Sequence, residues 1–168
     1  MKEELYLPGD IFVVYSGTFF ARTINRVQQF WDVDGQAKFN HAGVIIDADG
    51  TTIEALRTIQ NGNIYNYKDH LFMVGRPYAI TDEKFQVGYD AIKGHLGQSY
   101  PWWRLFLHVF PPAARHISTG NFPVCSELVA KFLHAAGYFP SWKGITPDVI
   151  ADRIKYWGIF KEVPNQKT

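Results

Sequence analysis

The chain contains one cysteine, Cys125, at a position that favours reactivity. It follows Pro123 and lies near the start of a run, 124–136, in which apolar residues recur with the period of an amphipathic helix. The free N–H groups and the positive dipole at the start of a helix favour a thiolate, the nucleophilic form of cysteine. A cysteine that only packs in the core would also begin such a stripe, so both interpretations stay open.

A thiolate nucleophile needs an imidazole that keeps it ionised and protonates the leaving group. Among six histidines, His41 stands out because it opens an expected strand and precedes Ala42 and Gly43, two small residues that leave space beside the ring. The alternative is a histidine that is merely hydrogen-bonded at a strand end. The other five form no His-Glu-x-x-His pattern and are expected to be surface or core residues: His70, His95, His108, His116 and His134.

The imidazole in turn needs a polar partner that fixes its tautomer, and Glu54 is the first candidate. Two runs rich in β-branched residues, 41–47 and 51–56, flank an Asp-Gly pair that is a strong hairpin signal. Because side chains alternate along a strand, a two-residue turn puts His41 and Glu54 on the same face. We therefore expect the two side chains to point in the same direction.

The hairpin register decides whether these side chains meet. With Asp49-Gly50 at the centre of the turn, Glu54 lies four positions from His41, on the order of 13 Å at ~3.3 Å per residue. With Ala48-Asp49 at the centre, or with a bulge that supplies the same shift, Glu54 becomes a diagonal neighbour within reach of His41. The alternative for Glu54 is a solvated strand acid. The fallback partners of His41 are Asp47, Asp10 and Asn121.

The remaining pattern predicts an α+β fold. Strands are expected at 11–15, 63–67, 70–76 and 158–163, and helices at 18–31, at 82–96 after the N-cap Thr81, and from 146 onward at a Thr-Pro-Asp start. Gly97 and Gly137 are the expected ends of the helices before them. Meandering strands flanked by helices indicate an antiparallel sheet. No repeat or linker divides the chain, so we expect one domain over 1–168.

Composition excludes several classes of protein. One thiol allows neither a disulfide framework nor a Cys-rich metal site. A net charge of +1 provides no electrostatic footprint for a nucleic acid, so none is expected as a partner. No apolar stretch approaches the roughly 18 residues of a membrane span, and the N-terminus carries two acids and no apolar region typical of an export signal. The expected location is therefore cytoplasmic.

Four segments follow one another in a characteristic order: Pro8-Gly9-Asp10-Ile11-Phe12, Asn40-His41-Ala42-Gly43-Val44-Ile45, Thr52-Ile53-Glu54-Ala55 and Pro123-Val124-Cys125-Ser126-Glu127-Leu128-Val129. This order resembles that of circularly permuted papain-like enzymes of the NlpC/P60 superfamily, in the branch of YiiX-like amidases. The resemblance implies an antiparallel sheet packed against helices. It also implies that the His and Glu strands precede the Cys helix, the reverse of the order in unpermuted members.

By position, the resemblance implies that Cys125 is the nucleophile, His41 the general base and acid, and Glu54 the residue that orients His41. The segment 96–102 is similar to the Gly-x-x-Tyr motif of the superfamily. The similarity implies that Tyr100 lines the site, where its hydroxyl positions the substrate carbonyl or adds to the oxyanion hole. The alternative for Tyr100 is a half-buried aromatic residue at a helix end. Residues 105–120 depart from the family pattern, because they form an extended insertion without a recognisable substrate motif.

The predicted function is amide hydrolysis through a thioester, with no metal or organic cofactor and with a peptide, such as a cell-wall peptide, or an acylated amine as substrate. The same three residues also serve lipid acyltransferases and phospholipases resembling lecithin:retinol acyltransferase. The Trp-rich segment 102–110 would then contact a lipid interface, although core packing also explains it. A non-catalytic binding module with an idle site is the third interpretation. The sequence predicts no oligomeric state.

Overall fold

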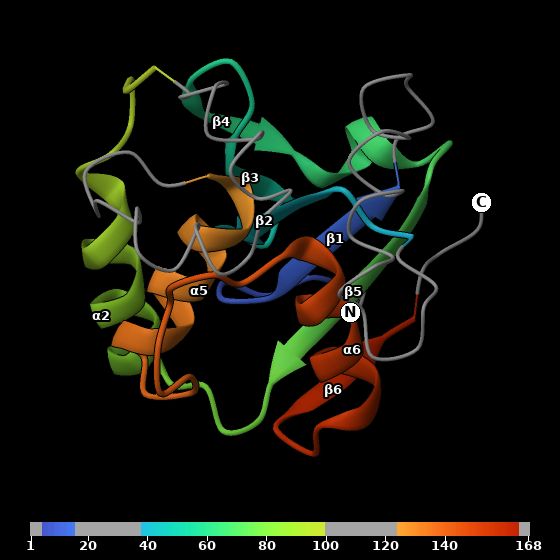
Figure 1. Cartoon of the computed structure of the whole chain (residues 1–168), viewed down its shortest axis with the longest axis vertical. Helices are drawn as coiled ribbons and strands as arrows, with labels where there is room; N and C mark the ends of the chain where they lie inside the picture. Colours follow the sequence, from blue (N-terminus) through green and yellow to red (C-terminus); the bar gives the residue numbers. More distant parts are fainter. Residues whose placement is uncertain (1–4, 16–37, 100–123, 165–168) are drawn as a thin grey trace.

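A six-stranded antiparallel sheet forms the centre of the computed structural model, which describes residues 5–15, 38–99 and 124–164 (Figure 1). The strands lie in the order β4-β3-β2-β1-β5-β6. Their bounds are β1 Ile11–Tyr15, β2 His41–Ile45, β3 Thr51–Ala55, β4 Ile59–Asn63, β5 Leu71–Pro77 and β6 Phe160–Val163. The helices are the 3-10 helix η1 Ile64–Tyr67 and the α-helices α2 Asp82–Lys93, α5 Cys125–Ala135 and α6 Pro147–Tyr156.

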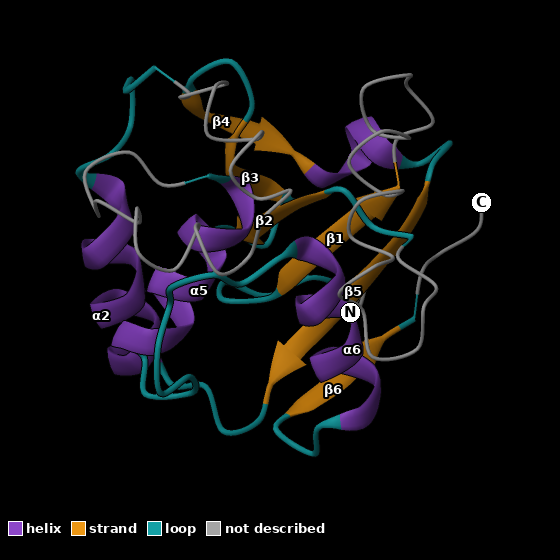
Figure 2. Cartoon of the chain, in the orientation of Figure 1, coloured by secondary structure: helices purple, strands orange, loops and turns teal. Residues whose placement is uncertain are grey.

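Strand alternation divides the apolar residues between two clusters, one on each face of the sheet. On one face, Val13, Val44 and Ile53 pack with apolar residues of α5 and α6, including Leu128 and Ile154. On the other face, strand residues pack with η1 and the chain before β1: Phe12, Val14, Ile45, Val74, Ile64 and Tyr6. Figure 2 shows the long helices in purple beside the sheet. Residues of both clusters are almost completely buried.

Local sequence accounts for the three α-helices. Thr81 caps α2 by accepting a hydrogen bond from Lys84 N at 3.3 Å, and Thr146 caps α6 in the same way, with Pro147 at the first helical position. The α5 stripe predicted over 124–136 is observed as Cys125–Ala135, with Gly137 following at φ +83°. The α2 helix is shorter than predicted: it ends at Lys93, and a turn precedes Gly97, whose φ is +81°.

One predicted strand is wrong. Residues Ile64–Tyr67 form η1, and the strand lies immediately before them, at Ile59–Asn63, paired with β3. Asn63 ends the strand because its side chain accepts a hydrogen bond from Tyr65 N at 3.0 Å and caps η1. The other predicted strands are confirmed, with bounds that differ by at most two residues. The predicted helix at 18–31 and the segment 102–110 lie outside the described residues.

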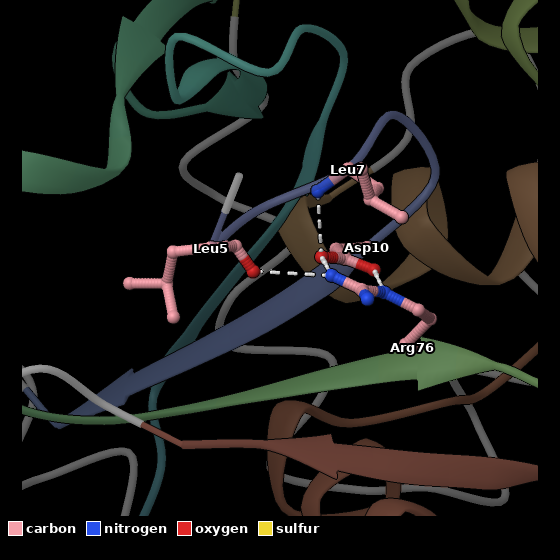
Figure 3. Close-up of polar contacts among 4 residues, drawn as sticks. All are labelled: Leu5, Leu7, Asp10 and Arg76. Atoms are coloured by element: carbon pink, nitrogen blue, oxygen red, sulfur yellow. Dashed lines mark hydrogen bonds and ion pairs between the residues drawn. The ribbon is translucent and has the colours of Figure 1, made fainter. Parts of the chain in front are cut away.

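An ion pair fastens the chain before β1 to β5. Arg76 donates from Nε to Asp10 Oδ1 and from Nη2 to Asp10 Oδ2, both at 2.8 Å, and from Nη2 to the Leu5 carbonyl at 3.1 Å (Figure 3). Leu7 N also donates to Asp10 Oδ2 at 2.9 Å. Asp10 is fully buried, and its carboxylate is satisfied by three of these hydrogen bonds. Together with the bond to Leu5, they tie the turn at Pro8 to the sheet.

Within the described parts of the chain, no helix is both long and apolar enough to cross a membrane.

Candidate active site

The β2–β3 hairpin adopts the second of the two registers considered for it. Gly43 pairs with Glu54, and Ile46 N donates to the Thr51 carbonyl at 2.8 Å. Asp47 and Gly50 flank the turn, with Gly50 N donating to Asp47 O at 3.0 Å and with Gly50 at φ +86°, a conformation that glycine adopts without strain. Glu54 is therefore a diagonal neighbour of His41.

His41 and Glu54 form a buried ion pair. His41 Nε2 donates to Glu54 Oε2 at 2.6 Å, and the two residues are only 8% and 1% exposed. The fallback partners do not take this role: Asp10 binds Arg76, and Asp47 accepts a hydrogen bond from Ala48 N at 2.6 Å in the exposed turn. Asn121 and Tyr100 lie outside the described residues.

Two further side chains hold the Glu54 carboxylate, and sequence reasoning missed both. Thr52 Oγ1 donates to Glu54 Oε1 at 2.9 Å, and the Tyr67 hydroxyl donates to Oε2, the oxygen that His41 also contacts. Gly62 makes room for the carboxylate, since a Cβ there would overlap Oε1 and lie 2.9 Å from Thr52 Oγ1. Strand alternation could have indicated Thr52, but the incorrect strand prediction over 63–67 hid Tyr67.

The space beside His41 is filled by aromatic rings. The Phe12 and Tyr67 ring centroids lie 6.1 Å and 5.8 Å from that of the imidazole. Phe12 is opposite Gly43 in the β1–β2 ladder, and a Cβ on Gly43 would come within 2.5 Å of Phe12 Cζ. Gly43 therefore leaves room for the Phe12 ring. The expectation of open space beside His41 is wrong, because aromatic rings occupy that space.

Cys125 is the first residue of α5, and hydrogen bonding and charge from its side chain contribute to raising the pKa of the nearby His41. Because Glu54 occupies Nε2, Nδ1 is the ring nitrogen left for the sulfur. Cys125 also belongs to the apolar cluster under α5 and is 7% exposed. The side chain that packs under α5 is therefore the same one that acts on the His41 imidazole.

Separate sets of hydrogen bonds position the start of α5 and the residues just before β2. Ser126 Oγ donates to the Ile145 carbonyl at 2.6 Å, and Val124 N donates to Glu127 Oε2 at 3.3 Å, which orient the first turn that carries Cys125. Before His41, the N–H groups of Lys38 and Phe39 donate to Asp148 Oδ1 at 3.0 Å and 3.3 Å. Asp148 lies in the first turn of α6, so that helix positions the chain entering β2.

The electrostatics favour a charged imidazole. Burial alone would lower the pKa of His41, but hydrogen bonding and charge from Cys125 and Glu54 outweigh it and raise this pKa to about 9. Burial likewise acts to raise the pKa of Glu54, whereas hydrogen bonds from His41, Tyr67 and Thr52 bring it below its ordinary value. The arrangement can therefore hold an imidazolium beside the Glu54 carboxylate at neutral pH.

The remaining histidines lie elsewhere or outside the described residues. The His70 ring packs edge-on against Tyr67, with centroids 6.2 Å apart, His95 lies 3.1 Å from Lys131 Nζ, and His134 contacts the Phe139 carbonyl. His108 and His116 fall in a segment that the structure does not describe. Over 5–15, 38–99 and 124–164, no group of three or more His, Cys, Asp or Glu side chains is arranged to hold a metal ion.

These features define an α+β protein with a buried Cys-His-Glu cluster at one end of an antiparallel sheet. No family model and no curated protein matches the chain. A search of solved structures finds similarity to the metalloprotein YiiX from Escherichia coli O157:H7, with a TM-score of 0.56 over 95% of this chain and 89% of that chain. The two sequences are 16% identical, so the likeness establishes a YiiX-like fold.

Proposed function

We propose that this chain is a cysteine hydrolase that cleaves an amide bond through a thioester, on a circularly permuted papain-like fold of the NlpC/P60 type. The observation that carries the proposal is the imidazole of His41, which binds the Glu54 carboxylate through Nε2 and lies beside the Cys125 thiol. An imidazole between a thiol and a carboxylate is the arrangement that nucleophilic catalysis requires. The YiiX-like fold is consistent with it.

In the first half of the proposed reaction, the Cys125 thiolate attacks the carbonyl carbon of an amide. The resulting oxyanion accepts hydrogen bonds from the backbone N–H of Cys125, which has no carbonyl partner within the helix because it lies in the first turn, and from a second donor. Imidazolium His41 gives its proton to the amide nitrogen as the C–N bond breaks. An amine leaves, and the acyl group remains on the sulfur as a thioester.

In the second half, neutral His41 takes a proton from water while the water oxygen attacks the thioester carbon. The C–S bond breaks, the carboxylic acid leaves, and Cys125 and His41 return to the thiolate and imidazolium pair. Glu54 keeps the ring in one orientation and stabilises its positive charge throughout. The expected substrates are peptides and acylated amines.

The name of the structural neighbour raises the question of a bound metal. The described residues of this chain do not fit a metal centre, as stated above, because they offer no group of three or more potential ligands. The proposed steps therefore use only side chains and backbone of this chain.

Hydrolysis of a panel of peptide amides and N-acyl amines tests the proposal. Cys125→Ala and His41→Ala should each lower turnover of the folded protein by at least about 10³-fold. Cys125→Ala should keep a thermal unfolding midpoint near that of the wild type, whereas His41→Ala should lower the midpoint, because it leaves the buried Glu54 carboxylate without its partner. His70→Ala is the matched control, since it removes a nearby exposed imidazole that contacts Tyr67 and not Glu54. Undiminished amide hydrolysis by Cys125→Ala would end the proposal.

Thiol alkylation gives a test that needs no known substrate. If Cys125 is paired with charged His41, iodoacetamide should modify it near pH 6, where an ordinary thiol is almost fully protonated. A thiol that only packs in the core should barely react. Mass spectrometry of the intact chain is unambiguous here, because Cys125 is the single cysteine.

A further inference from the structure

We propose that Tyr67 is a positioning residue of this site, which holds the Glu54 carboxylate ionised and directed at His41. The inference rests on the proposed function and adds a member to the site that the three-residue pattern does not contain. Tyr67 ends η1, and its hydroxyl donates to Glu54 Oε2, the same oxygen that accepts the hydrogen bond from His41.

Tyr67 contacts both members of the ion pair. Besides its hydrogen bond to Glu54, its ring packs against Phe12, with centroids 5.6 Å apart, and against the His41 imidazole, at 5.8 Å. The phenol therefore restrains the carboxylate while the ring restrains the imidazole. One side chain thus sets the relative position of the two groups whose alignment the proton transfers depend on.

The local fold keeps Tyr67 in place. Ile64 is buried, and its N–H donates to the Gly50 carbonyl at 2.9 Å, which ties η1 to the turn of the β2–β3 hairpin. Asn63 caps the start of η1, and His70 N donates to the Tyr67 carbonyl at 2.9 Å just after its end. The hairpin that brings Glu54 to His41 therefore also anchors the turn that carries Tyr67.

Electrostatics indicate what the hydroxyl does. Glu54 is 1% exposed, and a carboxylate so deeply buried becomes neutral unless donors stabilise its charge. The groups around it are His41 from β2, Tyr67 from η1, Thr52 from β3 and, across the ladder on β4, the neutral Gln60, with Cys125 of α5 beyond His41. Tyr67 contributes a donor without a positive charge, and its own pKa is raised by burial and by Glu54, so it stays protonated.

Tyr65 provides a matched control two residues earlier in the same 3-10 helix. Its side chain is 53% exposed and its ring meets Tyr6 edge-on at 5.8 Å. Tyr65→Phe and Tyr67→Phe remove the same atom from the same short helix. They differ in whether that atom binds Glu54.

The test measures the rate of iodoacetamide alkylation of Cys125 between pH 4 and pH 9. Removing the Tyr67 hydroxyl takes away a donor that favours the charged form of Glu54, so the carboxyl group protonates at a higher pH. Protonated Glu54 no longer stabilises charged His41, and the thiolate loses its partner. The acid limb of the profile is the range in which the alkylation rate rises with pH. In Tyr67→Phe this limb should therefore move to higher pH, so that at a given pH on the limb the rate is up to about tenfold lower than in the wild type. Tyr65→Phe should keep the wild-type profile.

A second variant is expected to shift the acid limb in the opposite direction. It keeps the proposal testable if Tyr67→Phe does not fold. Incorporating 3-fluorotyrosine at position 67 keeps the ring and makes the hydroxyl a stronger donor, so the acid limb should move to lower pH. If wild-type Cys125 does not react below pH 7, the proposed function itself fails. If the wild type reacts there and both changes at Tyr67 leave the acid limb in place, the role of Tyr67 alone is overturned.

Discussion

Two buried carboxylates in the same sheet region differ in what binds them. Asp10 and Glu54 are 0% and 1% exposed. Asp10 binds Arg76, whose guanidinium keeps its charge at every ordinary pH and forms two parallel hydrogen bonds. Glu54 binds His41, an imidazole that can give up and take back a proton, together with two neutral hydroxyl groups. The first cluster can only hold the chain together, whereas the second can also move a proton.

The two clusters lie at opposite ends of one strand ladder. Ile45 N donates to the Asp10 carbonyl at 2.7 Å at one end of β1 and β2, while His41 pairs with Val14 at the other. Four residues of a strand separate these ends, on the order of 13 Å at ~3.3 Å per residue. Substitutions in the two clusters should therefore have independent, additive effects, one set on stability and the other on chemistry.

The largest stability effect is expected for Arg76→Ala. The substitution leaves the buried Asp10 carboxylate without its counter-ion, which destabilises a protein by about 3 kcal/mol or more. For a chain of this size the unfolding midpoint should fall by roughly 6–12 °C, measured by circular dichroism. Cys125 alkylation by the folded fraction should be unchanged. The control is Lys93→Ala, which removes an exposed pair with Asp90 and should leave the midpoint as it was.

Gly62→Ala should disturb the Glu54 cluster and lower activity, whereas Arg76→Ala lowers stability. The added Cβ would displace Oε1 of Glu54, so the carboxylate could no longer align His41. Misplacement of that order lowers activity about 10²-fold. Gly94→Ala is the matched control, because position 94 has φ −66° and no atom within 4 Å of the added carbon. Equal activity of the two variants, with the same substrate, would contradict the assigned role of Gly62.

Glu54→Gln should have a smaller effect than loss of Cys125 or His41. Glutamine keeps the size of the side chain but removes the charge that stabilises the imidazolium, so turnover should fall on the order of tenfold. The rate of Cys125 alkylation near pH 6 should be lower than in the wild type as well. A variant whose alkylation profile matches that of the wild type would show that Glu54 does not support the charge of His41.

A fourth effect is the dependence of stability on pH that His41 confers. Its pKa is about 9 in the folded chain and about 6.5 when unfolded, because Cys125 and Glu54 overcome the opposing effect of burial. The resulting stabilisation is fully present below pH 6.5 and is lost as the pH rises through about 9. The free energy of unfolding, measured with urea, should therefore slope downward as the pH rises through about 9. His41→Gln should flatten the slope, and His70→Ala should preserve it.

Elements set by local chemistry were predictable from the sequence. The stripe from Cys125, the Thr81 and Thr146 caps and the strand at 11–15 all appear in the structure, because each depends on side-chain period or on one capping residue. The segment after Asn61 was not predictable in this way. Asn-Gly is a turn signal, but Gly62 lies within β4, where its missing side chain admits the Glu54 carboxylate.

The sequence by itself determined that one thiol begins a helix and that His41 and Glu54 share one face of a hairpin. It left two registers open, since the turn residues allow either and the side-chain alternation is the same in both. The tertiary structure decided between them. Phe12 fits over Gly43, Ile64 N donates to the Gly50 carbonyl in the hairpin turn, and the Tyr67 hydroxyl donates to the Glu54 carboxylate beside His41. These contacts join residues far apart in the chain, which no local pattern encodes.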